Sequence, residues 1–391
     1  MNQIPALTHH WLAQQRVHPN ADLRLVLPAE LDTMSSERVL LLTNPALRNS
    51  NVLQEVRKAI GHRLVGVYDG ISAHSPVDEV AAAAVAVLES KVDLVVALGG
   101  GSVIDAGKAA CYASWNGLVT GKSLLEGLPK GWAPSDWDRP LEGVRLLAIP
   151  TTLSAAEFSS HAGITDLETG RKHVVLHPQM VPKVVILDPR ATFETPAELL
   201  LSSAVRAVDH AVERFCSIRP TPFSDAVSRQ AMEMLRDSLP MILRECNDPG
   251  PRATAQAASW LSIMGGWAGT PVGASHGLGY ILGAYKGVPH GHTSCLMLHA
   301  VLRWNSKALS EDGLRRQELV ASCFGGAASA GDGIESFVRS LQLPTRLSAM
   351  NIQPSQFADI AAQYDGSGPI LTNPRRVAAA SDLIEILEIA Q

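Results

Sequence analysis

Apolar and polar positions follow two different rhythms along the chain. In the first half, short continuous apolar runs alternate with segments whose apolar residues recur every three or four positions. This pattern is typical of buried strands that alternate with helices, and it favours a parallel sheet covered on both faces. The runs predicted as strands are 38–44, 63–68, 94–98, 146–152 and 184–188.

Other segments of this half are predicted from the same pattern. Residues 51–60 and 77–91 have helical spacing, and a hairpin turn is predicted over 165–172. Residues 1–36 are predicted to be largely irregular, with a weakly alternating edge strand at 23–27. The segment 121–140 is rich in Gly, Pro and Trp, which indicates a long surface loop or hairpin.

Helical periodicity replaces the strand pattern after Pro189. The sequence Thr195-Pro196-Ala-Glu198 predicts a helix start with Thr195 as N-cap and proline in the first position. Several further helices are expected, the last over 381–390. We therefore predict an α/β domain over 1–189 and an all-helical domain over 190–391.

Composition narrows the functional classes. The chain has 391 residues, of which 46% are hydrophobic and 18% charged, with a formal net charge of −5. These values fit a globular protein and favour neither nucleic acid nor an anionic membrane as a partner. Five scattered cysteines without a C-x-x-C pair indicate reduced thiols. With no signal-peptide pattern in the first ten residues, we expect a cytoplasmic protein.

A glycine cluster joins the strand at 94–98 to an Ala-rich helical segment. It consists of Gly99, Gly100 and Gly101, followed by Ser102. Glycines let the backbone approach an anion, and the free N–H groups of a helix start point at it. Ser102 is a predicted N-cap and a candidate phosphate donor. The cluster could also be a tight turn without a ligand, but Asp105 and Lys108 after it favour phosphate binding.

The stretch from Gly99 to Lys108 resembles the pyrophosphate loop of the iron-containing (group III) alcohol dehydrogenases. That family includes the maleylacetate reductases and has dehydroquinate synthase as a distant relative. The resemblance implies a Rossmann-like sheet domain followed by a helical domain, with dehydroquinate synthase-like architecture. It also implies an NAD or NADP cofactor whose nicotinamide reaches a cleft between the two domains.

The resemblance extends to further cofactor positions. Pro150-Thr151-Thr152-Leu-Ser-Ala-Ala-Glu157 is similar to the family element that flanks the nicotinamide and phosphates, and Lys172 occupies the place of a family lysine. Asp105 belongs to the loop motif itself. NAD-preferring members often carry an acid where this chain has Asn44, which also starts an Asn-Pro turn. The choice between NAD and NADP therefore stays open.

The helical half resembles the family's metal-binding region with two departures. The family's Asp-x-x-x-His becomes Arg206-Ala-Val-Asp-His210. His276 and His290 fall on the other two ligand positions, and Tyr280 replaces a second histidine thought to relay protons. A guanidinium cannot ligate a cation, whereas three imidazoles can hold zinc or iron. Metal occupancy stays open, with His210, His276 and His290 as the candidate ligands.

The resemblance implies a nicotinamide-dependent alcohol dehydrogenase or carbonyl reductase, expected to be a homodimer. Arg206 and His210 are candidates to replace the metal as the group that polarises the carbonyl, or Arg206 pairs with a substrate carboxylate as in maleylacetate-reductase-like chemistry. Tyr280 or His276 is the candidate proton donor. Two alternatives remain. One is a lyase or cyclase that recycles its nicotinamide, as dehydroquinate synthase does, and the other is a nucleotide-binding relative without catalysis.

Overall fold

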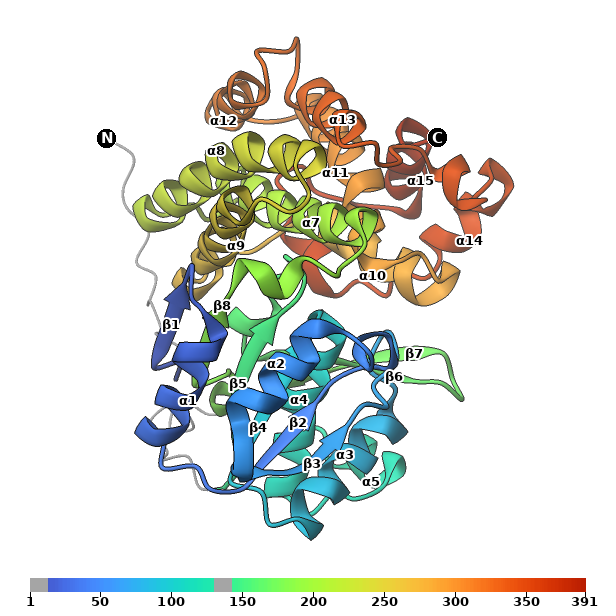
Figure 1. Ribbon diagram of the computed structural model, residues 1–391. Coiled ribbons are helices and arrows are strands. Elements are labelled where there is room, and N and C mark those ends of the chain that lie inside the picture. Colours follow the sequence, from blue (N-terminus) through green and yellow to red (C-terminus); the bar gives the residue numbers. More distant parts are fainter. Residues whose placement is uncertain (1–12, 130–142) are drawn as a thin grey trace. The chain divides into compact units, whose positions relative to one another are not determined.

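The computed structural model describes residues 13–129 and 143–391, which form two compact units (Figure 1). One unit spans Trp11–Thr195 and the other contains Pro196–Gln391. The first holds the strands and the second is helical, so the predicted α/β part followed by a helical part is confirmed. Each unit has a hydrophobic core of its own.

A six-stranded parallel sheet forms the centre of the α/β unit. Its strand order is β1-β8-β5-β4-β2-β3. The strands are β1 (Arg16–Pro19), β2 (Val39–Leu42), β3 (Leu64–Tyr68), β4 (Leu94–Gly99), β5 (Arg145–Pro150) and β8 (Val184–Leu187). A separate antiparallel hairpin consists of β6 (His161–Asp166) and β7 (Arg171–Leu176), as predicted around 165–172.

Helices cover the sheet and explain why its strands are apolar throughout. The helices are α1 (Leu23–Thr33), α2 (Asn51–Ile60), α3 (Val77–Glu89), α4 (Gly101–Trp115) and α5 (Gly121–Glu126). Leucines of α1 and α2 share one core with Leu41, Val96 and Leu147 of the strands. The alternate side chains of these strands point to the opposite face of the sheet, which α4 covers. There, Gly107 of α4 lies against Leu42 of β2. Since both faces are buried, β2 and β4 have no polar positions.

Five local predictions are wrong. The part of 1–36 that the structure describes is not largely irregular, because Arg16–Pro19 forms β1, which pairs with β8, and Leu23–Thr33 forms α1. The segment 23–27 is helical rather than an edge strand, because Leu23, Leu27 and Leu31 bury one helix face. Residues 121–126 form α5, whereas the rest of the predicted loop falls largely on 130–142, outside the described residues. Gly100 rather than Ser102 caps α4. Pro196 rather than Thr195 precedes the helix at 197.

The helical unit is arranged around one buried helix, α7 (Ala197–Phe215). It packs against α8 (Pro222–Arg244), α9 (Pro249–Met264) and α11 (His290–Ser306) (Figure 1). The remaining helices are α10 (Ala274–Lys286), α12 (Glu311–Cys323), α13 (Ala330–Ser340), α14 (Phe357–Ala361) and α15 (Ala380–Ile389). No helix in the described part of the chain is long and apolar enough to cross a membrane.

Every residue of α7 from Leu200 to Phe215 is buried, although several are charged or titratable. Buried ionisable groups are costly unless they are paired or serve a function. The charged stripe of α7 therefore marks the part of the helical unit where a site is expected.

Candidate active site

The glycine loop of the α/β unit is built for close backbone contact. β4 ends at Gly99, and α4 begins at Gly101. A Cβ on Gly99 would lie 2.6 Å from Val103 Cγ2, and one on Gly101 would lie 2.9 Å from Ser154 Oγ. Larger residues would force the strand end away from the helix. The loop leaves the N-terminal N–H groups of α4 at the carboxyl edge of the sheet, where α/β proteins bind ligands.

Ser102 lies in the first turn of α4 and anchors a neighbouring loop. Its Oγ accepts a hydrogen bond from the His74 N–H at 3.1 Å, and its carbonyl accepts one from Ser75 Oγ at 2.7 Å. His74 and Ser75 both have positive φ angles, 66° and 51°. Side chains rarely adopt this conformation, so the loop stores strain beside the glycines. Neither left-handed position is Gly or Asn, the residues that most often adopt this conformation.

Three predicted cofactor residues lie at the carboxyl ends of neighbouring strands. The N–H of Thr151 donates to the Gly99 carbonyl at 3.0 Å, and Thr152 lies against Gly100. Asn44 follows β2, which pairs with β4. Its Oδ1 accepts from the Leu47 N–H at 3.1 Å and caps a short helical turn. The structure thus brings these residues to the sheet edge that carries the glycine loop, and their contact with a cofactor stays a prediction.

Asp105 and Lys172 meet at the hairpin. Asp105 Oδ2 accepts from the Gly163 N–H at 2.9 Å, and Oδ1 pairs with Lys108 Nζ at 2.8 Å. The Lys172 stem lies against Gly163. Lys108 is fully buried and also donates to the Ala156 carbonyl at 2.9 Å. The Asp105 carboxylate therefore holds the hairpin to α4, and contact of Asp105 or Lys172 with a cofactor stays a prediction.

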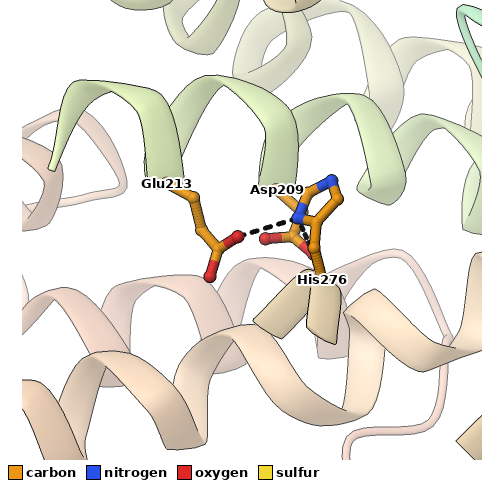
Figure 2. A group of neighbouring side chains, drawn as sticks. All are labelled: Asp209, Glu213 and His276. Carbon is orange, nitrogen blue, oxygen red and sulfur yellow. Dashed lines mark hydrogen bonds and ion pairs between the residues drawn. The ribbon is translucent and has the colours of Figure 1, made fainter. Parts of the chain in front are cut away.

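The helical unit assembles a second group of residues, shown in Figure 2. Glu213 of α7 lies 2.8 Å from His276 Nδ1 and accepts hydrogen bonds from the N–H groups of Gly273 and Ser275. Asp209, one turn earlier, lies 3.5 Å from the same nitrogen. Asp209 Oδ2 also accepts from the hydroxyls of Ser275 and Ser294. These two carboxylates hold the start of α10 and fix the ring of His276.

The predicted site residues of this unit lie together around that pair. The rings of His210 and His276 are stacked with centroids 4.8 Å apart, and those of Tyr280 and His290 are 6.2 Å apart. His210 Nδ1 and His276 Nε2 are buried without a hydrogen-bond partner. Burial, followed by the charge of His276, holds the pKa of His210 well below its usual value. His210 is therefore neutral at physiological pH.

Arg206 is almost completely buried among these rings, with 3% of its surface exposed. Its Nη1 donates to Ser294 Oγ at 3.1 Å and lies 3.7 Å from Asp209 Oδ2. The guanidinium carbon lies 5.5 Å from the centroid of the Tyr280 ring, a cation–π geometry. A permanent positive charge thus occupies the position where the resemblance implies a carboxylate ligand.

These residues do not fit the metal site that the resemblance implies. The ligand atoms of Asp209, Glu213 and His276 lie within 4.8 Å of one another, but hydrogen bonds to α10 and α11 already engage both carboxylates. At the usual ligand positions, three imidazoles remain beside the guanidinium of Arg206. A divalent cation there would be repelled by that charge and would lack the carboxylate that offsets its own.

Two further charged residues were not identified from the sequence. Glu213 lies four residues after Asp209 on α7, and Arg214 lies four residues after His210. Both are buried. A run of ionisable residues in a helix whose other faces are apolar was the available signal, because such residues are rarely buried without a partner or a role.

Comparisons with known proteins place this geometry in a family. The family models for iron-containing alcohol dehydrogenase and for its C-terminal region match residues 15–189 and 200–390. Dehydrogenase FUM7 of Gibberella moniliformis is 30% identical, over 84% of this chain and 85% of its own. Maleylacetate reductase 1 of Cupriavidus pinatubonensis is 26% identical, over 91% of each chain.

A solved structure shows the same fold. Sulfoacetaldehyde reductase from Bifidobacterium kashiwanohense, in complex with NAD⁺, superposes with a TM-score of 0.84 and 23% identity, over 98% of each chain. The dehydroquinate synthase-like architecture predicted from the sequence is thereby confirmed. With both family models matched over nearly the whole described chain, the protein belongs to the iron-containing alcohol dehydrogenase family of oxidoreductases, with maleylacetate reductases among its relatives.

Proposed function

We propose that the protein is an NAD(P)H-dependent carbonyl reductase that acts on a small aldehyde or ketone carrying an acidic group. The related sequences are dehydrogenases and reductases, and the related sulfoacetaldehyde reductase was solved with NAD⁺. The glycine loop and the neighbouring Thr151 and Thr152 support dinucleotide binding by the α/β unit. The imidazoles, Arg206 and Tyr280 support carbonyl chemistry by the helical unit.

The observation that carries this proposal is the buried guanidinium of Arg206. When hydride moves from the dihydronicotinamide to the carbonyl carbon, negative charge develops on the carbonyl oxygen. A fixed cation in a site of low dielectric stabilises that charge without moving. Ser294 and Asp209 hold Arg206 in place, so the guanidinium is pre-organised for this role. His210, neutral and adjacent, offers a second donor to the same oxygen.

A proton must reach that oxygen to complete the alcohol. His276 is one candidate donor, because Glu213 holds Nδ1 and leaves Nε2 without a protein partner. Tyr280 is the other, because its ring lies beneath Arg206 and it is partly exposed. The substitutions Tyr280→Phe and His276→Gln separate them: the donor's variant loses most of kcat, whereas the other variant loses less.

Arg206→Ala tests the proposal directly. We expect kcat/KM for NADPH- or NADH-dependent carbonyl reduction to fall by about 100-fold or more, since loss of one oxyanion-stabilising group costs about 3–4 kcal/mol. Arg316→Ala is the matched control, because Arg316 is paired with Asp225 and Asp312 elsewhere in the same unit. An Arg206→Ala enzyme with wild-type kinetics would contradict the proposed role.

Two further measurements distinguish the alternatives. Stoichiometric oxidation of the cofactor supports a reductase, whereas unchanged net cofactor with product formation indicates a lyase or cyclase. Cofactor binding without turnover of any carbonyl indicates a non-catalytic relative. We also expect activity to survive prolonged treatment with a chelator, because the donor set around Arg206 does not suit a divalent ion. Loss of activity that added iron or zinc restores would contradict this expectation.

A further inference from the structure

The start of α10 is held by side chains from two other segments. Gly273 is its N-cap and has no side chain that could accept from the first N–H groups of the helix. Glu213 of α7 accepts from the N–H groups of the residues before and after Ala274. The Ala274 N–H itself donates to Asn373 Oδ1 at 3.1 Å. Glu213 also contacts the ring of His276, whereas Asn373 contacts the backbone two residues before that histidine.

Gly273 makes room for both acceptors. A Cβ at this position would lie 2.9 Å from Asn373 Oδ1 and 3.1 Å from Glu213 Oε1. At most helix starts, a Ser, Thr, Asp or Asn in this place accepts from the helix with its own side chain. Here such a residue would have to displace one of the two acceptors. The start of α10 is therefore positioned by distant residues and not by a local cap.

The amide of Asn373 has one orientation. Its Nδ2 donates to the Arg375 carbonyl and to Asn305 Oδ1, both at 2.7 Å. If the amide were reversed, its oxygen would face these two oxygens, and its NH₂ group would face the Ala274 N–H. Asn305 and Asn373 are both buried, where an unmatched polar group is costly. The contacts of Nδ2 therefore fix Oδ1 as the acceptor for α10.

The end of α11 holds the segment that carries Asn373. Asn305 lies in the last turn of α11 and is paired with Asn373 through both amide groups. The guanidinium carbon of Arg375 lies 3.5 Å from the ring centroid of Trp304, and its Nη1 donates to the Trp304 carbonyl at 2.8 Å. Because α11 begins at His290, the helix that carries one imidazole of the site also anchors the start of the helix that carries another.

We propose that Asn373, held by Asn305, is a positioning residue for the reductase. It sets the start of α10 and thereby the place of the group that protonates the carbonyl oxygen. This inference rests on the proposed function, in which His276 and Tyr280 are the candidate donors. Both lie on α10, one turn apart, so the position of either donor depends on Asn373. Asn373 acts through the backbone of the helix and not on the substrate itself.

Two substitutions at position 373 test this role. Asn373→Ala removes the acceptor and both donor contacts. Asn373→Asp keeps an acceptor for the Ala274 N–H but places an oxygen against the Arg375 carbonyl and Asn305 Oδ1. We expect both variants to lower kcat per folded molecule about 10- to 100-fold, as a small displacement of a catalytic group does. The KM for NADH or NADPH should change little, because the proposed cofactor residues lie in the α/β unit.

The solvent isotope effect separates positioning from stability. We expect the ratio of kcat in H₂O to kcat in D₂O to rise in both variants, because a misplaced donor makes proton transfer more rate-limiting. Thr221→Ala is the matched control, since Thr221 is also buried and caps α8 by accepting from the Ser224 N–H at 3.0 Å. It should lose stability but keep the wild-type isotope ratio. An unchanged ratio in both Asn373 variants would overturn the proposal.

Hydrogen exchange keeps this inference separate from the proposed function. Without substrate, the amides of residues 274–280 should exchange faster in Asn373→Ala than in the wild type, because the helix start opens more often. In Thr221→Ala they should exchange at the wild-type rate. If the wild type reduces no carbonyl compound in a panel that includes 4-oxobutanoate, the proposed function fails while exchange still tests the contact. If exchange in α10 is equal in wild type and Asn373→Ala, the inference is wrong.

Discussion

Within α7 and α10, positive and negative groups alternate over a few turns and almost cancel. Arg206 is matched by Asp209, and Glu213 is matched by the ring of His276. Substitutions at these positions therefore change the balance of a low-dielectric cluster, and we expect double substitutions among them to be strongly non-additive.

Asn44 offers a test of cofactor choice at one residue. Aspartate caps a helical turn as well as asparagine does, so Asn44→Asp should fold normally while it adds a negative charge at the end of β2. This charge would repel the 2′-phosphate of NADPH and accept from the ribose hydroxyls of NADH. We expect the ratio of kcat/KM for NADH over NADPH to rise about 10-fold. Asn44→Ser, which caps without a charge, should shift the ratio much less.

Glu157 gives the α/β unit a pH-dependent stability. Burial, opposed by backbone hydrogen bonding and Lys108, raises the pKa of Glu157 from 4.5 to about 7. The folded state thus holds a proton that the unfolded chain releases above pH 4.5, and stability falls as pH rises toward 7. The full effect is on the order of 3 kcal/mol.

Glu157→Gln removes this dependence, because an amide does not ionise. We expect the difference in melting temperature, variant minus wild type, to increase between pH 5 and pH 8. Thermal denaturation at both pH values, with Asp78→Asn on exposed surface as control, measures it. A difference that stays constant or decreases with pH would contradict the assignment.

The sequence motifs predicted which residues lie together, but they did not predict all the contacts that those residues make. The positions Arg206, His210, His276, Tyr280 and His290 do lie together, because motif spacing on helices fixes which side chains share a face. The contacts that Ser102 and Asp105 make with distant segments were not predictable, and their binding of a cofactor stays a prediction. Ser102 contacts a loop 28 residues away in sequence, and Asp105 holds a hairpin 58 residues away. Local sequence does not encode such contacts.

At the level of elements, the start of α10 depends on α7. The N–H groups of Gly273 and Ser275 donate to Glu213, and the Ala274 N–H donates to Asn373 Oδ1. The first N–H groups of a helix have no partner within it. The Glu213 carboxylate of α7 therefore caps α10 and also orients His276. A shift of α10 relative to α7 would move the His276 ring as well.

Glu213→Gln should weaken both functions. We expect a loss of about 2 kcal/mol in the free energy of unfolding, since hydrogen bonds to a buried charged group contribute about 1.5–3 kcal/mol, together with reduced kcat. Glu198→Gln is a suitable control, because Glu198 also contacts a histidine, His292, but is largely exposed. Urea denaturation and steady-state kinetics of both variants provide the comparison. Equal effects in the two variants would contradict the capping role.

Helices whose apolar residues keep a single helical spacing were predictable from the sequence. Helices in which other residues interrupt that spacing were not. The helix 51–60 matches α2 residue for residue, because its apolar positions keep a single helical spacing. In α1, Leu25 and Val26 interrupt the spacing of the buried leucines, and Pro28 lies inside the helix. The helix start is fixed by a distant group, since the Leu23 N–H donates to Asp188 Oδ2.

At the level of the whole molecule, the chain forms two compact units, and its oligomeric state is a prediction. The sequence indicated a boundary near Pro189, and the compact units divide between Thr195 and Pro196. We expect a homodimer in solution. Size-exclusion chromatography with light scattering should give twice the mass of one chain at micromolar concentration, and a monomer mass across that range would contradict the expectation.

The pairing of β1 with β8 has a consequence for biosynthesis. These neighbouring strands come from opposite ends of the α/β unit, with Arg16 beside Val184 and Pro19 beside Leu187. While the ribosome extends the nascent polypeptide, β1 has no partner until nearly the entire unit has left the exit tunnel. Contacts between distant segments form late and slowly. The N-terminal strand must therefore stay available, and protected from premature association, for most of translation.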